Sequence, residues 1–119
     1  MANPIDLTVK LVELQIRLET GHYPDSTWPT EQTFKDAHVF LLNLNPIEII
    51  PPSIGIADDG EINFYWKFDE ILIDLGFYGN GTYSYFAQDS EGMNYHGDDL
   101  DVNTFKLPDT VLNLIKQGN

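Results

Sequence analysis

Residues 53–86 read SIGIADDGEINFYWKFDEILIDLGFYGNGTYSYF, and apolar side chains recur there at every second position. A period of two is typical of β-strands that bury one face. Three turn signals divide the stretch, so we predict a four-stranded antiparallel meander over about residues 53–88. The predicted turns are Asp58-Asp59-Gly60, Lys67-Phe68-Asp69-Glu70 and Asn80-Gly81.

The lengths of these turns predict how neighbouring strands pair. Each turn fixes the register of the two strands that it joins. The first is a three-residue loop with glycine in the left-handed conformation, the second a four-residue turn and the third a two-residue Asn-Gly turn. A register error of one residue would move every side chain to the opposite face. The predicted pairs are Ile56 with Ile62, Trp66 with Ile71, and Leu75 with Phe86. The predicted apolar face contains Ile54, Ile56, Ile62, Phe64, Trp66, Ile71, Ile73, Leu75, Phe77 and Phe86.

The opposite face of the predicted sheet carries tyrosines. Tyr65, Tyr83 and Tyr85 fall there, and Tyr85 lies across from Gly76. Tyrosine is enriched at protein interfaces because its ring is both apolar and polar. Part of the pattern is structural, since an aromatic ring can cover a glycine on the neighbouring strand. We predict a partner-binding role for the three tyrosines; coverage by residues 88–106 or by a second subunit is the alternative.

Helices are predicted before and after the meander in the sequence. Residues 5–20 carry two apolar stripes and favour a helix, with a broken strand as the alternative. Thr30 is a suitable N-cap for a second helix over about residues 31–43, and Pro108 opens a short C-terminal helix. The predicted fold class is therefore α+β. A single domain spans residues 1–119, with the two N-terminal helices and the C-terminal helix packed on the apolar face of the sheet.

The charge of the chain is one-sided. It has 19 acidic residues against 6 Lys and Arg, a formal net charge of −13. Between Lys67 and Lys106 there is no Lys or Arg, but there are eight carboxylates. Direct binding to nucleic acid or to an anionic membrane is disfavoured, because both depend on Lys and Arg. Such self-repulsion lowers stability, so we expect the field to serve the binding of a basic partner.

Several classes of protein are disfavoured by what the sequence lacks. It has no Cys, which excludes disulfides and thiolate metal sites. The N-terminal residues MANPIDLTVK do not resemble a signal peptide, and no apolar run approaches the ~18 residues of a membrane span. We therefore expect a soluble, cytoplasmic protein.

One segment places an imidazole among carboxylates. His96 lies two and three residues before Asp98 and Asp99, and a metal site would need a His nitrogen and carboxylate oxygens to converge. The spacing, however, matches neither a zinc signature nor an EF-hand, and no serine sits in a G-x-S-x-G motif. We predict no catalytic residue, no cofactor and no metal ligand. A small metal-dependent hydrolase centred on His96 and its neighbouring Asp residues is the alternative.

Three pieces of the sequence resemble a pattern shared by a set of small proteins. Pro51-Pro52 followed by DGEINFYW at residues 59–66, His96-Gly97, and LPDTVLNLI at residues 107–115 form the pattern. It resembles uncharacterised proteins common in bacterial genomes and mobile elements, and it spans roughly residues 28–115. The set has no established activity, so the resemblance implies a fold and no mechanism.

The leading functional hypothesis is a non-enzymatic inhibitor or binding protein with a carboxylate-rich surface. Carboxylates on a rigid scaffold can imitate a phosphate backbone, as in anti-CRISPR and anti-restriction proteins of phages and in immunity proteins and antitoxins. The expected partner is a basic protein, such as a nucleic-acid-binding enzyme; a homodimer or a self-associating structural protein is the alternative. Besides the tyrosines, the predicted partner-binding residues are exposed acids after the fourth strand, namely Asp89, Glu91, Asp98, Asp99 and Asp101.

Overall fold

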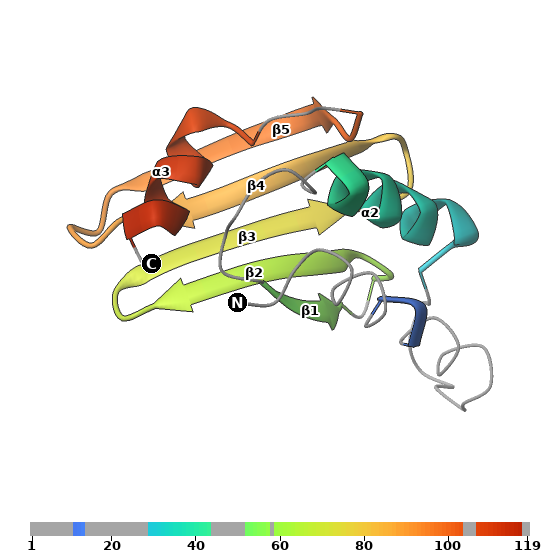
Figure 1. The fold of residues 1–119 in the computed structure, drawn as a ribbon, viewed down its shortest axis with the longest axis horizontal. Helices are drawn as coiled ribbons and strands as arrows, with labels where there is room; N and C mark the ends of the chain where they lie inside the picture. Colours follow the sequence, from blue (N-terminus) through green and yellow to red (C-terminus); the bar gives the residue numbers. More distant parts are fainter. Residues whose placement is uncertain (1–10, 14–28, 44–51, 58, 104–106, 118–119) are drawn as a thin grey trace.

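The computed structural model describes residues 11–13, 29–43, 52–57, 59–103 and 107–117. Its main elements are α2 (Glu31–Asn43), β1 (Ser53–Ile56), β2 (Ile62–Phe68), β3 (Ile71–Phe77), β4 (Thr82–Gln88), β5 (Asn94–Asp101) and α3 (Asp109–Gln117). The strands form one antiparallel sheet in the order β1-β2-β3-β4-β5. Helices α2 and α3 lie on the same face of this sheet (Figure 1). The predicted α+β class and the meander are confirmed, with five strands where four were predicted.

The first turn has the predicted geometry. The Ala57 N–H donates to the Glu61 carbonyl at 2.9 Å, and the Gly60 N–H donates to the Ala57 carbonyl at 3.0 Å. Gly60 has a φ of 89°, which a residue with a side chain rarely adopts. Ile56 pairs with Ile62, so the predicted register of β1 and β2 is confirmed.

The second turn is shorter than predicted. Phe68 pairs with Ile71, which leaves two residues between the strands where four were expected. Asp69 adopts a φ of 49°, a left-handed conformation that Asp tolerates better than most residues. The predicted pair of Trp66 with Ile71 is therefore wrong. Because the error is two residues, an even number, every side chain of β2 and β3 still lies on its predicted face.

At the third turn, the observed register of β3 and β4 differs from the predicted one by one residue. Leu75 pairs with Tyr85, and not with Phe86 as predicted. Because of this one-residue shift, each side chain of β4 lies on the face opposite to the predicted one. Tyr83 lies in the core with 2% of its surface exposed, whereas Phe86 is 41% exposed on the opposite face. Tyr85 is half-buried against the core cluster, so the predicted tyrosine surface loses two of its three members.

Contacts with helix α2 explain this register. The Gly81 N–H donates to the buried Asp36 carboxylate at 2.8 Å. Gly79 lies so close to the first turn of α2 that a Cβ there would be 2.5 Å from Thr33 Oγ1 and 3.0 Å from Thr30 Oγ1. Helix α2 therefore holds the β3–β4 turn in a conformation that the Asn80-Gly81 dipeptide alone does not specify.

Strand β5 is an element that the sequence did not predict. It pairs with β4 alone in the described sheet and forms an edge of it. Its register changes between Tyr83 and Tyr85, where β5 contains one residue more than β4. Asp99 lies at this β-bulge with a φ of 55°. The segment after β4, for which no strand was predicted, is thus largely a strand.

Both described helices agree with their predicted positions. Helix α2 spans residues 31–43 as predicted, and Thr30 Oγ1 accepts a hydrogen bond from the Thr33 N–H at 3.1 Å, as an N-cap does. Helix α3 begins after Pro108. Residues 11–13 are helical, but the rest of the helix predicted over residues 5–20 lies outside the described residues. The helices contribute to the core Phe34, Ala37, Phe40, Leu41, Val111, Leu114 and Ile115.

The core is centred on aromatic rings between α2 and the sheet. Phe77 lies with its ring centroid 5.2 Å from that of Phe40, 5.0 Å from that of Phe64 and 5.7 Å from that of Tyr83. Phe40 also contacts Tyr83 edge-to-face, with the centroids 4.9 Å apart. All four rings are at least 98% buried. The helix-bearing face of the sheet is therefore the buried one, and the opposite face, which we call the outer face, carries the exposed side chains.

Candidate functional site

The acidic residues predicted as a partner site gather at β5 and the turn before it. We call Asp89, Glu91, Asp98, Asp99 and Asp101 the acidic edge. The structure places three of them on β5 itself and the other two in the β4–β5 turn. Glu91 and the three aspartates of β5 are exposed, as the sequence predicted, whereas Asp89, also predicted to be exposed, is partly buried. The strand is what brings these carboxylates into one row at the margin of the sheet.

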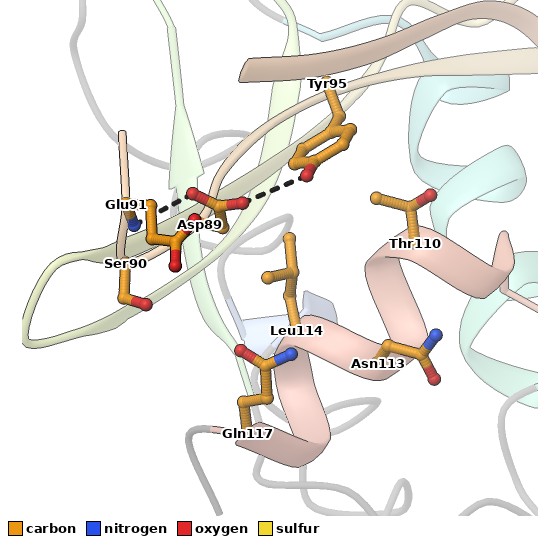
Figure 2. Close-up of a pocket in the computed structure, with 8 residues that line it drawn as sticks. All are labelled: Asp89, Ser90, Glu91, Tyr95, Thr110, Asn113, Leu114 and Gln117. Atoms are coloured by element: carbon orange, nitrogen blue, oxygen red, sulfur yellow. Dashed lines mark hydrogen bonds between the residues drawn. The ribbon is translucent and has the colours of Figure 1, made fainter. Parts of the chain in front are cut away.

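Asp89 has a structural role within the acidic edge. Its Oδ1 accepts hydrogen bonds from the N–H groups of Glu91 and Met93, both at 2.9 Å. Its Oδ2 accepts one from the Tyr95 hydroxyl at 3.0 Å (Figure 2). These bonds, led by that from the Met93 N–H, hold the pKa of Asp89 below its ordinary value. Asp89 therefore keeps its negative charge at neutral pH while it closes the turn.

The hydrogen bond from Tyr95 gives a pH prediction. Because the pKa of Asp89 is lowered in the folded state, its contribution to stability is present above the unfolded pKa and is lost as the pH falls through the folded pKa. We expect Tyr95→Phe to raise the Asp89 pKa, since one hydrogen bond to the ionised form is removed. NMR titration of the Asp89 side-chain carboxyl carbon measures this. Tyr65→Phe is the matched control and should leave the Asp89 titration unchanged; an unchanged titration in Tyr95→Phe as well would contradict the role of this bond.

A polar pocket lies between the β4–β5 turn and helix α3 (Figure 2). Its volume is about 390 Å³. The turn contributes Asp89 and Glu91, and α3 contributes Thr110, Asn113 and Gln117. These side chains offer amide and hydroxyl groups next to two carboxylates, a lining suited to a cationic or hydrogen-bonding group.

A second cavity, also of about 390 Å³, adjoins the first. The two share Ser90 and Gln117, and the second reaches Asp69 and Glu70 in the β2–β3 turn. We call the pair the acidic groove. Both turns lie at the same end of the sheet, beside α3 (Figure 1). No Lys or Arg from the described residues lines either cavity, so the groove carries the same sign of charge as the acidic edge.

The outer face of the sheet carries apolar side chains where the sequence predicted tyrosines. Tyr65, Leu72 and Phe86 are exposed by 42%, 36% and 41%, respectively. Phe86 pairs with His96 on β5 and with Asp74 on β3, so these side chains share one row across the sheet. Of the three tyrosines predicted to bind a partner, Tyr65 alone is exposed on this face; Tyr78, which follows β3, is exposed by 52%. The aromatic ring opposite a glycine is real, but Tyr85 covers Gly97 of β5 and not Gly76.

A network of polar side chains crosses the outer face beside this patch. Asn63 Nδ2 donates to Glu61 Oε1 at 2.6 Å and to Asp74 Oδ1 at 3.0 Å. Burial raises the pKa of the Asp74 carboxyl, because the charged form is partly desolvated. A hydrogen bond to Glu61 and partial burial raise the pKa of Tyr78 to about 12. The outer face thus carries two hydrogen-bonded carboxyl groups, those of Glu61 and Asp74, on the side of the sheet on which His96 lies.

The structure gives no specific geometry for a metal centre at His96. Within residues 11–13, 29–43, 52–57, 59–103 and 107–117, no group of three or more His, Cys, Asp and Glu side chains is arranged to hold a metal ion. His96 is exposed on β5, at the edge of the sheet. His38, which falls on the inner side of α2, is half-buried, and burial lowers its pKa.

Comparisons with known proteins identify no relative. No protein-family model matches the sequence, and no curated protein or solved structure matches it. In the part of the chain that the structure describes, no helix has both the length and the apolar character needed to cross a membrane. The surface itself is therefore the basis for inferring a function.

Proposed function

We propose that the protein binds a basic protein partner through the acidic edge. The observation that carries this proposal is the exposed row of Asp98, Asp99 and Asp101 on β5. Edge strands of natural sheets commonly carry charged side chains, especially Lys. Here every charged side chain of the strand is acidic, within a chain of net charge −13.

The electrostatic field of such a surface acts mainly on association. A single sign of charge over one margin steers an oppositely charged protein toward it and raises the association rate. Carboxylates fixed on a strand also resemble the phosphates of a nucleic acid in the sign of their charge. A protein whose natural ligand is nucleic acid is therefore the class of partner that we propose, and the binding protein would act as its inhibitor.

Neutralising β5 tests the proposal. We expect Asp98→Asn, Asp99→Asn and Asp101→Asn together to leave the free energy of unfolding within about 0.5 kcal/mol of the parent, because the residues are exposed. Asn suits the left-handed conformation at position 99. At position 101, the side-chain carbonyl of Asn can still accept the hydrogen bond that the Asn103 N–H donates to Asp101 at 2.8 Å. Thermal and chemical unfolding measure this result.

The same triple variant should bind more slowly. A partner captured from host lysate at low and high salt is purified, and its association rate with each variant is measured by surface plasmon resonance. We expect a reduced association rate at low salt, with the difference shrinking near 1 M salt, where the Debye length is about 3 Å. The matched control removes three charges elsewhere, with Glu13→Gln, Glu31→Gln and Asp59→Asn. Equal loss in both variants, or none in either, would show that the acidic edge is not the recognition surface.

A further inference from the structure

Among the described residues, no strand pairs with the outward edge of β5, and the positions of its outward backbone groups follow from the hairpin. The β4–β5 hairpin is closed by the Asp89 N–H, which donates to the Met93 carbonyl at 2.9 Å. In an antiparallel pair, residues that exchange hydrogen bonds alternate with residues that do not. Counting from Met93, the backbones of Tyr95 and Gly97 face β4. The N–H and C=O groups of the intervening residues therefore point away from the sheet, at Asn94, His96 and Asp98.

This stretch of edge is accessible and regular. Asn94, His96 and Asp98 are all exposed. The regular part ends at Asp99, whose left-handed conformation forms the bulge. Residues 94–98 thus offer a short strand template with outward donors and acceptors. The opposite edge, β1, is four residues long, SIGI, and carries no charge.

The side chains of β5 indicate which strand would fit. Asn94 and His96 pair with Gln88 and Phe86 and so lie on the outer face, and Asp98 follows them in the same alternation. Asp101 pairs with Thr82 and lies on that face too. A neighbouring strand would therefore place one outer-face side chain beside Asp98, and a longer strand another near Asp101, where Lys or Arg is favoured as a cross-strand partner.

The other side of β5 has a different character. Tyr95 and Leu100 lie on the helix-bearing face and pack partly buried against the core. The alternate side chains of an added strand would extend this apolar surface, which suits β-branched residues. A second copy of this chain is a poor occupant, because it would bring together two molecules that each carry a net charge of −13.

We propose that β5 accepts an extended segment of the basic partner as a sixth strand, with Lys or Arg and β-branched residues at alternate positions. Main-chain hydrogen bonds would give affinity and the side-chain alternation would give specificity, as in other cases of β-strand addition. This inference rests on the proposed function and adds to it the conformation and the sequence pattern of the bound segment.

The test uses the full chain and a nine-residue peptide of alternating Lys and Val, acetylated and amidated. Its control is the same peptide N-methylated at the central Lys and the adjacent Val, which keeps the charge but removes a donor from each edge of the strand. We expect the methylated peptide to bind at least about tenfold more weakly by calorimetry, since more than one hydrogen bond is lost. Binding of the parent peptide should also slow hydrogen exchange at the N–H groups of Asn94, His96 and Asp98.

A pair of protein variants gives the reciprocal test. His96→Pro removes an outward N–H that β4 does not use, and proline is tolerated on edge strands at such positions. His96→Ala removes the same side chain and keeps the N–H. We expect the proline variant to bind the Lys-Val peptide at least about tenfold more weakly than the alanine variant. If His96→Pro does not fold, the comparison of the two peptides on the parent protein decides the matter.

The outcomes separate the two proposals. Equal, salt-dependent binding of both peptides would overturn strand addition and leave an acidic surface that binds cations without pairing. Binding of neither peptide at low salt would overturn strand addition and the proposed function together. A stable dimer of the free protein, measured by light scattering, with protected N–H groups on β5 would overturn the inference by identifying a second copy as the occupant.

Discussion

Phe77→Ala is expected to lower the free energy of unfolding by about 3–5 kcal/mol. The ring is fully buried, and it contacts Phe40, Phe64 and Tyr83 at centroid distances of 5.2, 5.0 and 5.7 Å. Truncation removes these contacts and leaves a cavity that the surrounding rings fill incompletely. Urea unfolding followed by circular dichroism measures the loss.

Phe86→Ala is the matched control for this variant. Phe86 has the same side chain on the neighbouring strand but is 41% exposed on the outer face. We expect Phe86→Ala to cost about 1 kcal/mol or less. Similar losses for the two variants would contradict the observed β3–β4 register and favour the register predicted from the sequence, in which Phe86 belongs to the core.

Asp36→Ala is expected to lower the free energy of unfolding by about 1–3 kcal/mol. The Asp36 carboxylate is 3% exposed and accepts hydrogen bonds from the Gly81 N–H at 2.8 Å and from Gln32 Nε2 at 2.7 Å. Removing it leaves the Gly81 N–H without this acceptor beside α2, and a hydrogen bond to a charged group is lost. Chemical unfolding gives the magnitude, and faster hydrogen exchange at the Gly81 N–H would locate the effect.

Two further variants define the mechanism of this loss. Gln32→Ala removes the exposed donor and should change stability by no more than about 0.5 kcal/mol. Asp36→Asn keeps an acceptor for one of the two bonds and should recover part of the stability. Were Asp36→Ala as mild as Gln32→Ala, the link between α2 and the β3–β4 turn would contribute little to the fold.

The sequence was sufficient to predict the faces of β2 and β3. Their alternation leaves large apolar residues such as Phe64 and Leu75 with a single buried side, and an error of two residues in the turn does not change that side. The β1–β2 turn was also predictable, because Asp59-Gly60 combines a favourable turn residue with a glycine at the required left-handed position.

The β3–β4 register could not be read from the sequence in the same way. Strand β4 reads TYSYFAQ, and either face of it carries aromatic side chains. Tyrosine suits a buried or an exposed position, so the alternation does not select one of them. The selection comes from Asp36 and Thr33 of α2, which contact the turn at Gly81 and Gly79. Such contacts between distant parts of the chain are not visible in a local pattern.

The candidate site was predicted in its residues but not in its form. The acids of β5 were expected to be exposed, and they are, yet the strand that aligns them was missed because Gly97 and three aspartates disfavour a strand locally. One signal was present: Ser90-Glu91-Gly92 forms a three-residue loop whose hydrogen bonds match those at Ala57, Gly60 and Glu61, with Gly92 at a φ of 84°. The acidic groove depends on where α3 packs, which the sequence pattern does not specify.

The order of the strands in the sheet, which follows their order in the chain, has a consequence for how quickly the protein folds. Each strand pairs with the strand next to it in sequence, and the connections within the sheet are tight turns. Closing such short loops costs little chain entropy, so the sheet can grow by adding one hairpin after another. We therefore expect refolding nearer the fast end of the range for β-rich domains, where long-range strand pairing usually sets the rate. The long-range steps that remain are the closure of the β3–β4 turn onto α2 and the packing of α3 against β3.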